Sequence, residues 1–157
     1  MTALGNASWL RWWWPAIVWA ALIASFSTDV LSAEHTSRII LPLLHWMFPK
    51  LAAAKLAHWH HYIRKAAHVG EFFLLSLFLA RGIRRGRRGW HLAWAATAVA
   101  IAAAWAALDE LHQAFVPSRG ASMRDVLIDI SGALLAQFCY AVLIRWREAP
   151  ARAAQLS

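Results

Sequence analysis

Four predominantly apolar stretches divide this 157-residue chain, and each is close to the length of a bilayer-spanning helix. They cover residues 12–27, 64–80, 90–108 and 125–144. Apolar residues make up 61% of the sequence and its mean hydropathy is +0.44, which excludes a disordered chain and indicates a membrane protein. We therefore predict an all-α fold, an integral membrane four-helix bundle with an amphipathic surface segment between the first and second helices.

The length of the chain allows one domain, residues 1–157. The formal net charge is +8, but the bases are clustered between the apolar stretches. A membrane protein with basic loops explains that pattern better than a nucleic-acid partner does. The lone Cys139 lies inside the last apolar stretch, cannot form an intrachain disulfide and is most simply a small core residue.

The first apolar stretch has two interpretations. A short apolar core followed by small residues is typical of a cleavable signal peptide. The run Trp12, Trp13, Trp14 instead favours a retained helix whose indole rings lie at headgroup depth. After it, residues 39–48 and 51–62 have helical spacing, which predicts one or two amphipathic helices along the membrane surface.

Arginine clusters predict the orientation of the chain. Residues 81–89 hold five arginines, and Arg145, Arg147 and Arg152 follow the last apolar stretch. Short basic loops stay in the cytoplasm, so both termini are expected there, with the remaining polar stretches on the outer side. The third helix is rich in alanine, which allows backbones to approach closely, and is expected at the centre of the bundle.

One of these polar stretches covers residues 109–132. It places four acids, Asp109, Glu110, Asp125 and Asp129, at or inside the ends of spanning helices. Ionisable groups are costly at that depth, so they mark a functional site by default.

A second polar stretch covers residues 64–72. Here Lys65 and His68 share one helix face, with Glu71 beside them. Glu71 is roughly 10 Å along the helix from Arg64, which predicts that Glu71 is the deepest acid of the site. We expect the two polar stretches to face each other.

These charges have a simpler explanation as ion pairs that hold the helix ends together. Buried ion pairs often contribute little net stability, however. Six of the eight acids belong to this end of the predicted bundle, a concentration that favours a site. They are Asp29, Glu71, Asp109, Glu110, Asp125 and Asp129.

A metal site is another hypothesis, because Asp125 with Asp129, and His68 with Glu71, each present two ligands on one helix face. Oxygen-rich ligation suits Mg²⁺ or Mn²⁺ better than Zn²⁺. No ligand motif of known spacing is complete, so the sequence assigns no metal ligand and no cofactor. The histidines at 58, 60 and 61 could also bind a metal, but are more simply interfacial residues.

The two polar stretches together resemble the VanZ-like membrane family over about residues 26–140. The motifs that carry the resemblance are Arg64-Lys65-x-x-His68-x-x-Glu71-Phe72, Asp109-Glu110-x-x-Gln113-x-Phe115-x-Pro117-x-Arg119 and Asp125-x-x-x-Asp129-x-x-Gly132. Ser118 departs from the family pattern, since a glycine is expected before the arginine, and it tolerates a positive φ less well. The resemblance implies lowered susceptibility to the glycopeptide teicoplanin as a phenotype, and it supplies no reaction.

The leading hypothesis is a polar pocket at the outer leaflet that binds or acts on a lipid-linked or cell-envelope ligand, in a bacterial inner or plasma membrane. We predict catalytic roles for His68, Glu71, Asp109, Glu110 and Asp125, and ligand-binding roles for Lys65, Gln113, Arg119 and Asp129. Acid/base chemistry would centre on His68 and Glu71. Two alternatives stay open: a divalent-metal-dependent lipid phosphate transferase or hydrolase, and a non-catalytic scaffold or transport component. The sequence does not specify an oligomeric state.

Overall fold

The structure, a computed structural model, describes residues 3–26, 33–115 and 121–153, and their regular structure is entirely α-helical. The all-α prediction is therefore confirmed. The five helices are α1 (Ala3–Phe26), α2 (Ala33–Met47), α3 (Ala53–Arg84), α4 (Leu92–Gln113) and α5 (Met123–Ala153).

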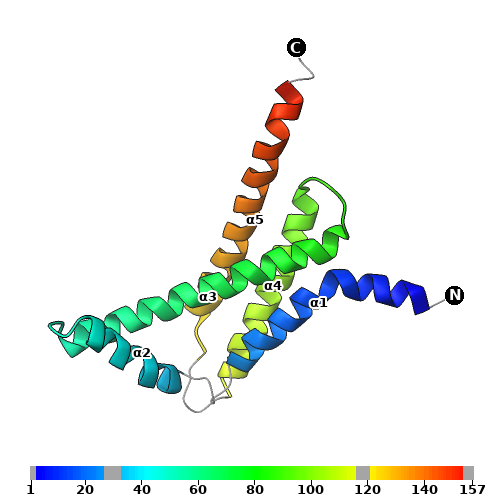
Figure 1. Cartoon of the computed structure of the whole chain (residues 1–157). Helices are drawn as coiled ribbons and strands as arrows, with labels where there is room; N and C mark the ends of the chain where they lie inside the picture. Colours follow the sequence, from blue (N-terminus) through cyan, green and yellow to red (C-terminus); the bar gives the residue numbers. More distant parts are fainter. Residues whose placement is uncertain (1–2, 27–32, 116–120, 154–157) are drawn as a thin grey trace.

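Helix α3 is the centre of the fold, since it packs against each of the other four helices. The alanine pattern of residues 90–108 predicts that role for α4, and that prediction is wrong. Helix α4 packs mainly on α3 and α5. Small residues let two backbones approach, but a helix contacts many partners only if it is long enough to reach them. At about 1.5 Å per residue α3 is roughly 48 Å long, and Figure 1 shows it crossing the whole molecule.

Helix α3 is continuous where the sequence pattern predicts a surface helix over 51–62 and a separate spanning helix from residue 64. That break is absent. Between Ala53 and Arg84 there is no proline, and Gly70 is the one glycine before the last turn. The charges of Arg64 and Lys65 mark the edge of the apolar stretch without ending the helix. The amphipathic segment before α3 is α2, which contains Pro42.

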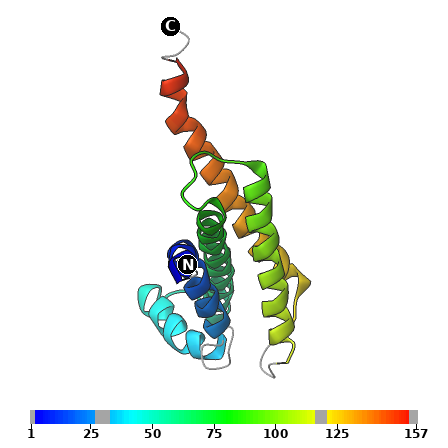
Figure 2. The ribbon, with the colours of Figure 1, turned by 90° about the vertical axis from the view of Figure 1, so that its right-hand side faces the viewer.

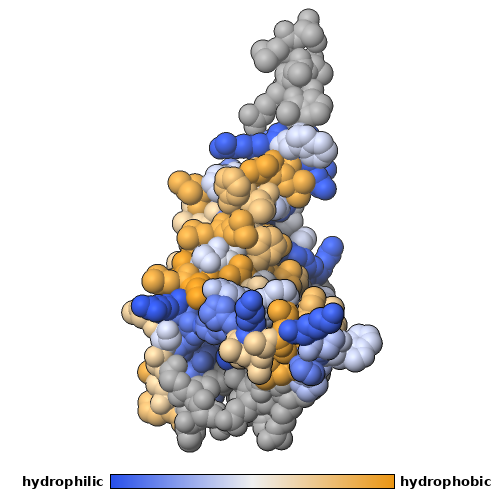
Figure 3. All heavy atoms as spheres, turned by 90° about the vertical axis from the view of Figure 1, so that its left-hand side faces the viewer, coloured by the Kyte–Doolittle hydropathy of each residue, from blue (hydrophilic) through white to orange (hydrophobic). Residues whose placement is uncertain are grey.

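Three helices are long and apolar enough to cross a membrane: α3, α4 and residues 123–148 of α5. Within the described residues α1 does not meet that standard, because Arg11 and a group of tryptophans reduce its hydropathy. The predicted four-helix bundle is therefore not what forms. Figures 1 and 2 show α3 crossing α4 and α5 steeply, instead of running beside them as helices of a bundle do. Figure 3 shows a band of hydrophobic residues between two hydrophilic zones, as a membrane setting requires.

The crossing of α3 and α5 is very close at Gly132. A methyl group placed on Gly132 would lie 2.3 Å from the backbone oxygen of Val69. Beside this point Phe72, Leu75 and Ala133 are almost completely buried. The glycine thus lets the two longest helices touch backbone to backbone, and this contact sets which side chains of α3 and α5 meet.

The arginine-rich residues 81–88 lie at one end of the molecule, which we call the arginine end. The start of α1 packs there: Arg81 Nη1 donates to the backbone oxygen of Trp12 at 3.2 Å, and the Trp13 ring lies against Gly82. The turn after α3 places Arg85 and Gly86 at positive φ. The opposite end, where the two polar stretches lie, is the site end.

Candidate functional site

The α3–α5 crossing brings the two polar stretches together. Lys65 Nζ of α3 donates to Asp125 Oδ1 of α5. One turn further along, His68 Nδ1 lies 3.4 Å from Asp129 Oδ1. The spacings of three residues on α3 and four on α5 place both pairs on facing stripes of the two helices. The stripes run on to Gly132, where the helices are in contact.

The two pairs differ in burial. Lys65 and Asp125 keep 24% and 26% of their side-chain surface exposed, whereas Asp129 keeps 1%. Asp125 also lies in the first turn of α5, where the helix dipole stabilises an acid. The Lys65–Asp125 pair therefore lies at the mouth of the site and Asp129 at its floor.

His68 has two carboxylates near one of its ring nitrogens. Besides Asp129, the Glu71 Oε2 atom lies 4.0 Å from His68 Nδ1. Within the described part of the chain, neither His68 Nδ1 nor Asp129 Oδ1 has a directed hydrogen bond, so their 3.4 Å contact is electrostatic. An imidazole held beside two carboxylates can exchange a proton with either of them or with a ligand.

Glu71 is not the most buried acid of the site, and its predicted depth in the bilayer stays a prediction. Its side chain is 21% exposed, whereas the most buried acid is Asp129, at 1%. Position along a helix measures depth in a bilayer, whereas burial depends on which neighbouring helix covers the residue. Helix α1 fixes the backbone here, since Trp19 Nε1 donates to the backbone oxygen of Glu71 at 2.9 Å.

The last turn of α4 contributes three buried polar residues. Asp109, Glu110 and Gln113 are 7%, 5% and 6% exposed. Gln113 Nε2 donates to Asp109 Oδ2 at 2.7 Å, and the backbone N–H of Ser122 donates to Glu110 Oε2 at 2.6 Å. Glu110 thus ties the end of α4 to the start of α5.

The α4 acids lie close enough to the α5 acids to interact electrostatically. The carboxylate of Asp129 is repelled by those of Asp109 and Asp125. The carboxylate of Glu110 is repelled by those of Asp109, Asp125 and Asp129. The structure therefore gathers eight of the predicted site residues at one end, from three helices. Arg119, which the sequence predicts as a ligand-binding residue, and Ser118 lie outside the described residues.

An apolar groove of about 400 Å³ opens beside Asp109, between the end of α1 and the end of α4. Trp105 and Leu108 form its apolar wall on α4, Ala24 and Ser25 line it on α1, and His112 also borders it. Within the described residues the Trp105 indole N–H is buried with no hydrogen-bond acceptor. The groove therefore joins an apolar wall to the acidic site.

Sequence reasoning missed two buried polar residues on the same stripes, Ser76 and Gln137. Gln137 Nε2 donates to Ser76 Oγ at 2.8 Å, and Ser76 Oγ donates to the backbone oxygen of Ala133 at 3.1 Å. Ser76 lies eight residues after His68, and Gln137 eight residues after Asp129, so extending the two stripes would have found them. Their polar groups are hydrogen-bonded to each other and to the backbone, so the two residues form a buried link between α3 and α5.

The histidines before Lys65 lie apart from the site. His58 and His61 are exposed and contact the Tyr62 ring edge to face, at 5.0 and 6.0 Å between ring centroids. Among the residues that the structure describes, no group of three His, Cys, Asp or Glu side chains could hold a metal ion.

Comparison with known proteins identifies the family. No curated protein and no solved structure matches the chain significantly. The sequence profile of the VanZ/LLP1 family matches residues 12–145, which include every candidate site residue on α3, α4 and α5. The three candidate spanning helices agree with an integral membrane protein. The chain belongs to the VanZ/LLP1 family.

Proposed function

We propose that the site end binds the polar headgroup of an amphiphilic, lipid-linked cell-envelope ligand, whose apolar part lies in the groove beside Asp109. The observation that carries this proposal is that the groove lined by Trp105 and Leu108 reaches Asp109, one of the buried acids of the site. Small-molecule sites in proteins combine a mostly apolar wall with a few converging polar groups. An amphiphile can present its headgroup to the charges and keep its tail in lipid.

The composition of the site favours a headgroup rich in hydrogen-bond donors. Of the eight predicted site residues that the structure describes, five are acids and two are bases. The acids are Glu71, Asp109, Glu110, Asp125 and Asp129, and the bases are Lys65 and His68. Carboxylates accept hydrogen bonds from hydroxyl and amine groups, as sugars and amino sugars carry. We assign Lys65 and Arg119 to any phosphate of the ligand.

We assign proton transfer to His68 and Glu71. Their 4.0 Å separation, with Asp129 Oδ1 3.4 Å from the same imidazole nitrogen, supports this role. A base must lie within hydrogen-bond reach of the proton it takes, and contacts of this kind tighten when a ligand binds. Asp109 borders the groove and would contact the ligand, whereas the bond from Ser122 to Glu110 supports a role in fixing the start of α5.

Two other functions have less support. A metal-dependent lipid phosphate enzyme needs converging ligands, and Asp125 is already bound to Lys65 while no described trio of ligands converges. A scaffold or transport component would need a polar path through the molecule. The Ser76–Gln137 link beyond Asp129 is instead buried and satisfied by its own partners.

Groove-filling variants test the proposal. Leu108→Trp places a large ring in the groove beside Asp109, and Leu111→Trp places the same ring on an exposed part of α4 outside the groove. Native mass spectrometry of detergent-released protein should show a co-purified envelope amphiphile with the wild type and with Leu111→Trp, and its loss with Leu108→Trp. Cells producing the two variants should differ in teicoplanin susceptibility in the same order. Equal retention and equal susceptibility for both variants would contradict the proposed site.

A further inference from the structure

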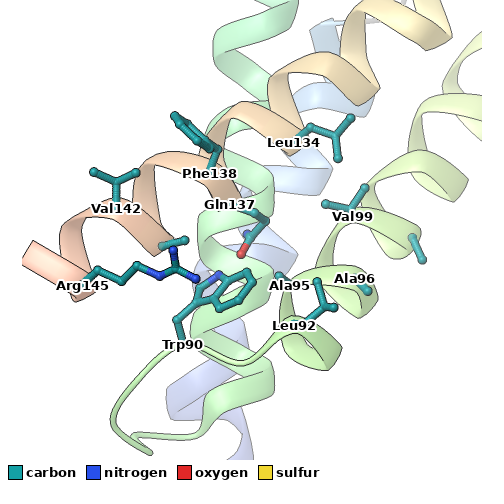
Figure 4. A pocket seen from close by; sticks show the side chains of 12 residues that line it. Trp90, Leu92, Ala95, Ala96, Val99, Leu134, Gln137, Phe138, Val142 and Arg145 are labelled. Atoms are coloured by element: carbon teal, nitrogen blue, oxygen red, sulfur yellow. The ribbon is translucent and has the colours of Figure 1, made fainter.

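A second, larger groove lies at the arginine end, between the start of α4 and the C-terminal half of α5. Its volume is about 640 Å³, within the range of roughly 300–1,000 Å³ that ligand sites occupy. Figure 4 shows Val99 on α4 opposite Leu134 on α5, with Phe138 and Val142 further along α5. Leu134, Phe138 and Val142 are 54%, 66% and 50% exposed, so this wall is open to its surroundings.

The polar groups of the groove are gathered at one end. Arg145 and Trp90 both line it, and Figure 4 shows the Arg145 guanidinium next to the Trp90 ring. Within the described residues the Trp90 indole N–H is buried with no acceptor. The end of the groove therefore offers a fixed positive charge and an unused hydrogen-bond donor, which together suit an anionic oxygen. Gln137 lies further in, with its amide nitrogen already bound to Ser76.

The length of the groove matches one leaflet of a bilayer. From Arg145 to Leu134 the helix rises by about 16 Å. Half of the hydrocarbon core of a bilayer is roughly 15 Å thick. An apolar channel of this length with a cationic end is complementary to one acyl chain that carries an anionic headgroup.

We propose that this groove binds an anionic glycerophospholipid of the leaflet at the arginine end. One acyl chain lies between Val99 and Phe138, the phosphate contacts Arg145, and the Trp90 N–H donates to a phosphate or ester oxygen. The site is separate from the site end, and it does not depend on the function proposed above. Its lipid lies between the first half of α4 and the middle of α5.

Photo-crosslinking in nanodiscs tests the headgroup preference. The probes are phosphatidylglycerol and phosphatidylcholine, each with a diazirine on one acyl chain, and the labelled peptides are mapped by mass spectrometry. With the wild type, phosphatidylglycerol should label the 134–142 segment more than phosphatidylcholine does. Arg145→Gln should reduce that preference about fivefold, the factor that one arginine near an anionic surface contributes. Trp90→Phe removes the N–H but keeps an aromatic ring, and should also reduce it.

Matched controls separate the groove from the general lipid-facing surface. Arg147→Gln removes an exposed arginine outside the groove and should leave the preference unchanged. Leu134→Trp fills the groove and should abolish groove labelling, whereas Leu135→Trp, on the neighbouring exposed position, should not. Circular dichroism melts confirm that each variant is folded.

Two results would overturn the proposal. Equal labelling by the two lipids, unaffected by Arg145→Gln, would mean that the groove is only part of the lipid-facing surface. Absence of label together with a dimer that Leu134→Trp dissociates would mean that a second copy of the chain covers the groove.

Discussion

At the scale of single residues, burial separates the carboxylates of the site into two kinds. Asp129 is 1% exposed and faces His68, so its charge has little contact with water. Asp125 is 26% exposed and paired with Lys65. Breaking a buried pair leaves an uncompensated charge, whereas a half-exposed pair is screened by solvent and contributes little. The two aspartates of one stripe should therefore respond differently to the same substitution.

Replacing each of them by alanine measures this difference. Asp129→Ala should lower the free energy of unfolding by about 3 kcal/mol. Asp125→Ala should lower it by about 1 kcal/mol, through loss of the Lys65 pair and of the helix-dipole interaction. Thermal melts of the two variants in one detergent give the comparison. A larger loss of unfolding free energy from Asp125→Ala than from Asp129→Ala would show that burial does not determine which pair stabilises the protein more.

Glu71 decides whether the site performs proton chemistry or only holds helix ends together. Its carboxylate is half-buried and lies 4.0 Å from the imidazole of His68, too far for a strong hydrogen bond. Glu71→Gln keeps the shape and removes the charge, so we expect an unchanged melt and loss of function in a teicoplanin susceptibility assay. Glu148→Gln, at the arginine end, is the control. A lower melting temperature with function retained would instead show that Glu71 stabilises the packing of the helices and takes no part in proton transfer.

At the scale of helices, the contact between Gly132 and Val69 sets the register of the site. If α3 and α5 moved apart there, Lys65 and His68 would lose their partners on α5, because all four residues lie on the stripes that meet at this point. Small residues also line the buried face of α4, where Ala98, Ala102 and Ala106 are 0% exposed, but a buried alanine face does not make its helix the central one. This is why composition alone assigns the central place to the wrong helix.

Two glycine-to-alanine substitutions test the crossing with the same chemical change. In Gly132→Ala the new methyl group meets the Val69 backbone oxygen at 2.3 Å, and a backbone atom cannot rotate away. The free energy of unfolding should fall by about 1–3 kcal/mol as the helices separate. In Gly70→Ala the methyl group meets nothing within 4 Å, so the better helix propensity should raise it by up to about 1 kcal/mol. If both variants changed the free energy of unfolding by the same amount and in the same direction, the close approach at Gly132 would not contribute to stability.

Sequence alone predicts three of the four apolar spans, those on α3, α4 and α5, and it places the acids of α4 and α5 near helix ends. Apolar pattern and charge determine both features locally. The continuity of α3 was not predicted because two consecutive basic residues, Arg64 and Lys65, end the apolar pattern of the sequence without ending the helix. The depth of Asp129 and the groove at Trp105 depend on which helices pack together, and spacing within one helix carries no information about that.

At the scale of the whole molecule, the two ends differ in charge, and this difference predicts the topology. The arginine end carries Arg81, Arg84, Arg85, Arg87 and Arg88 together with Arg145, whereas the acids of the site gather at the other end. Short loops rich in lysine and arginine stay on the cytoplasmic side of a membrane, and this preference orients membrane proteins. We propose that the arginine end and both termini are cytoplasmic and that the site end faces outward. This topology requires α1 to cross as well, from Trp12 at the arginine end to Ala24 beside the groove.

Cysteine accessibility tests this orientation on intact cells. The native Cys139 is exposed, so the interpretation of it as a small core residue is wrong, and it is first replaced by serine. Single cysteines are then introduced as Arg88→Cys at the arginine end and Met123→Cys at the start of α5, both at exposed positions. A membrane-impermeant maleimide should label Met123→Cys on intact cells and Arg88→Cys only after permeabilisation, because the bilayer shields the cytoplasmic loop. The reverse labelling would invert the molecule and place the acidic site, with its proposed ligand, on the cytoplasmic side.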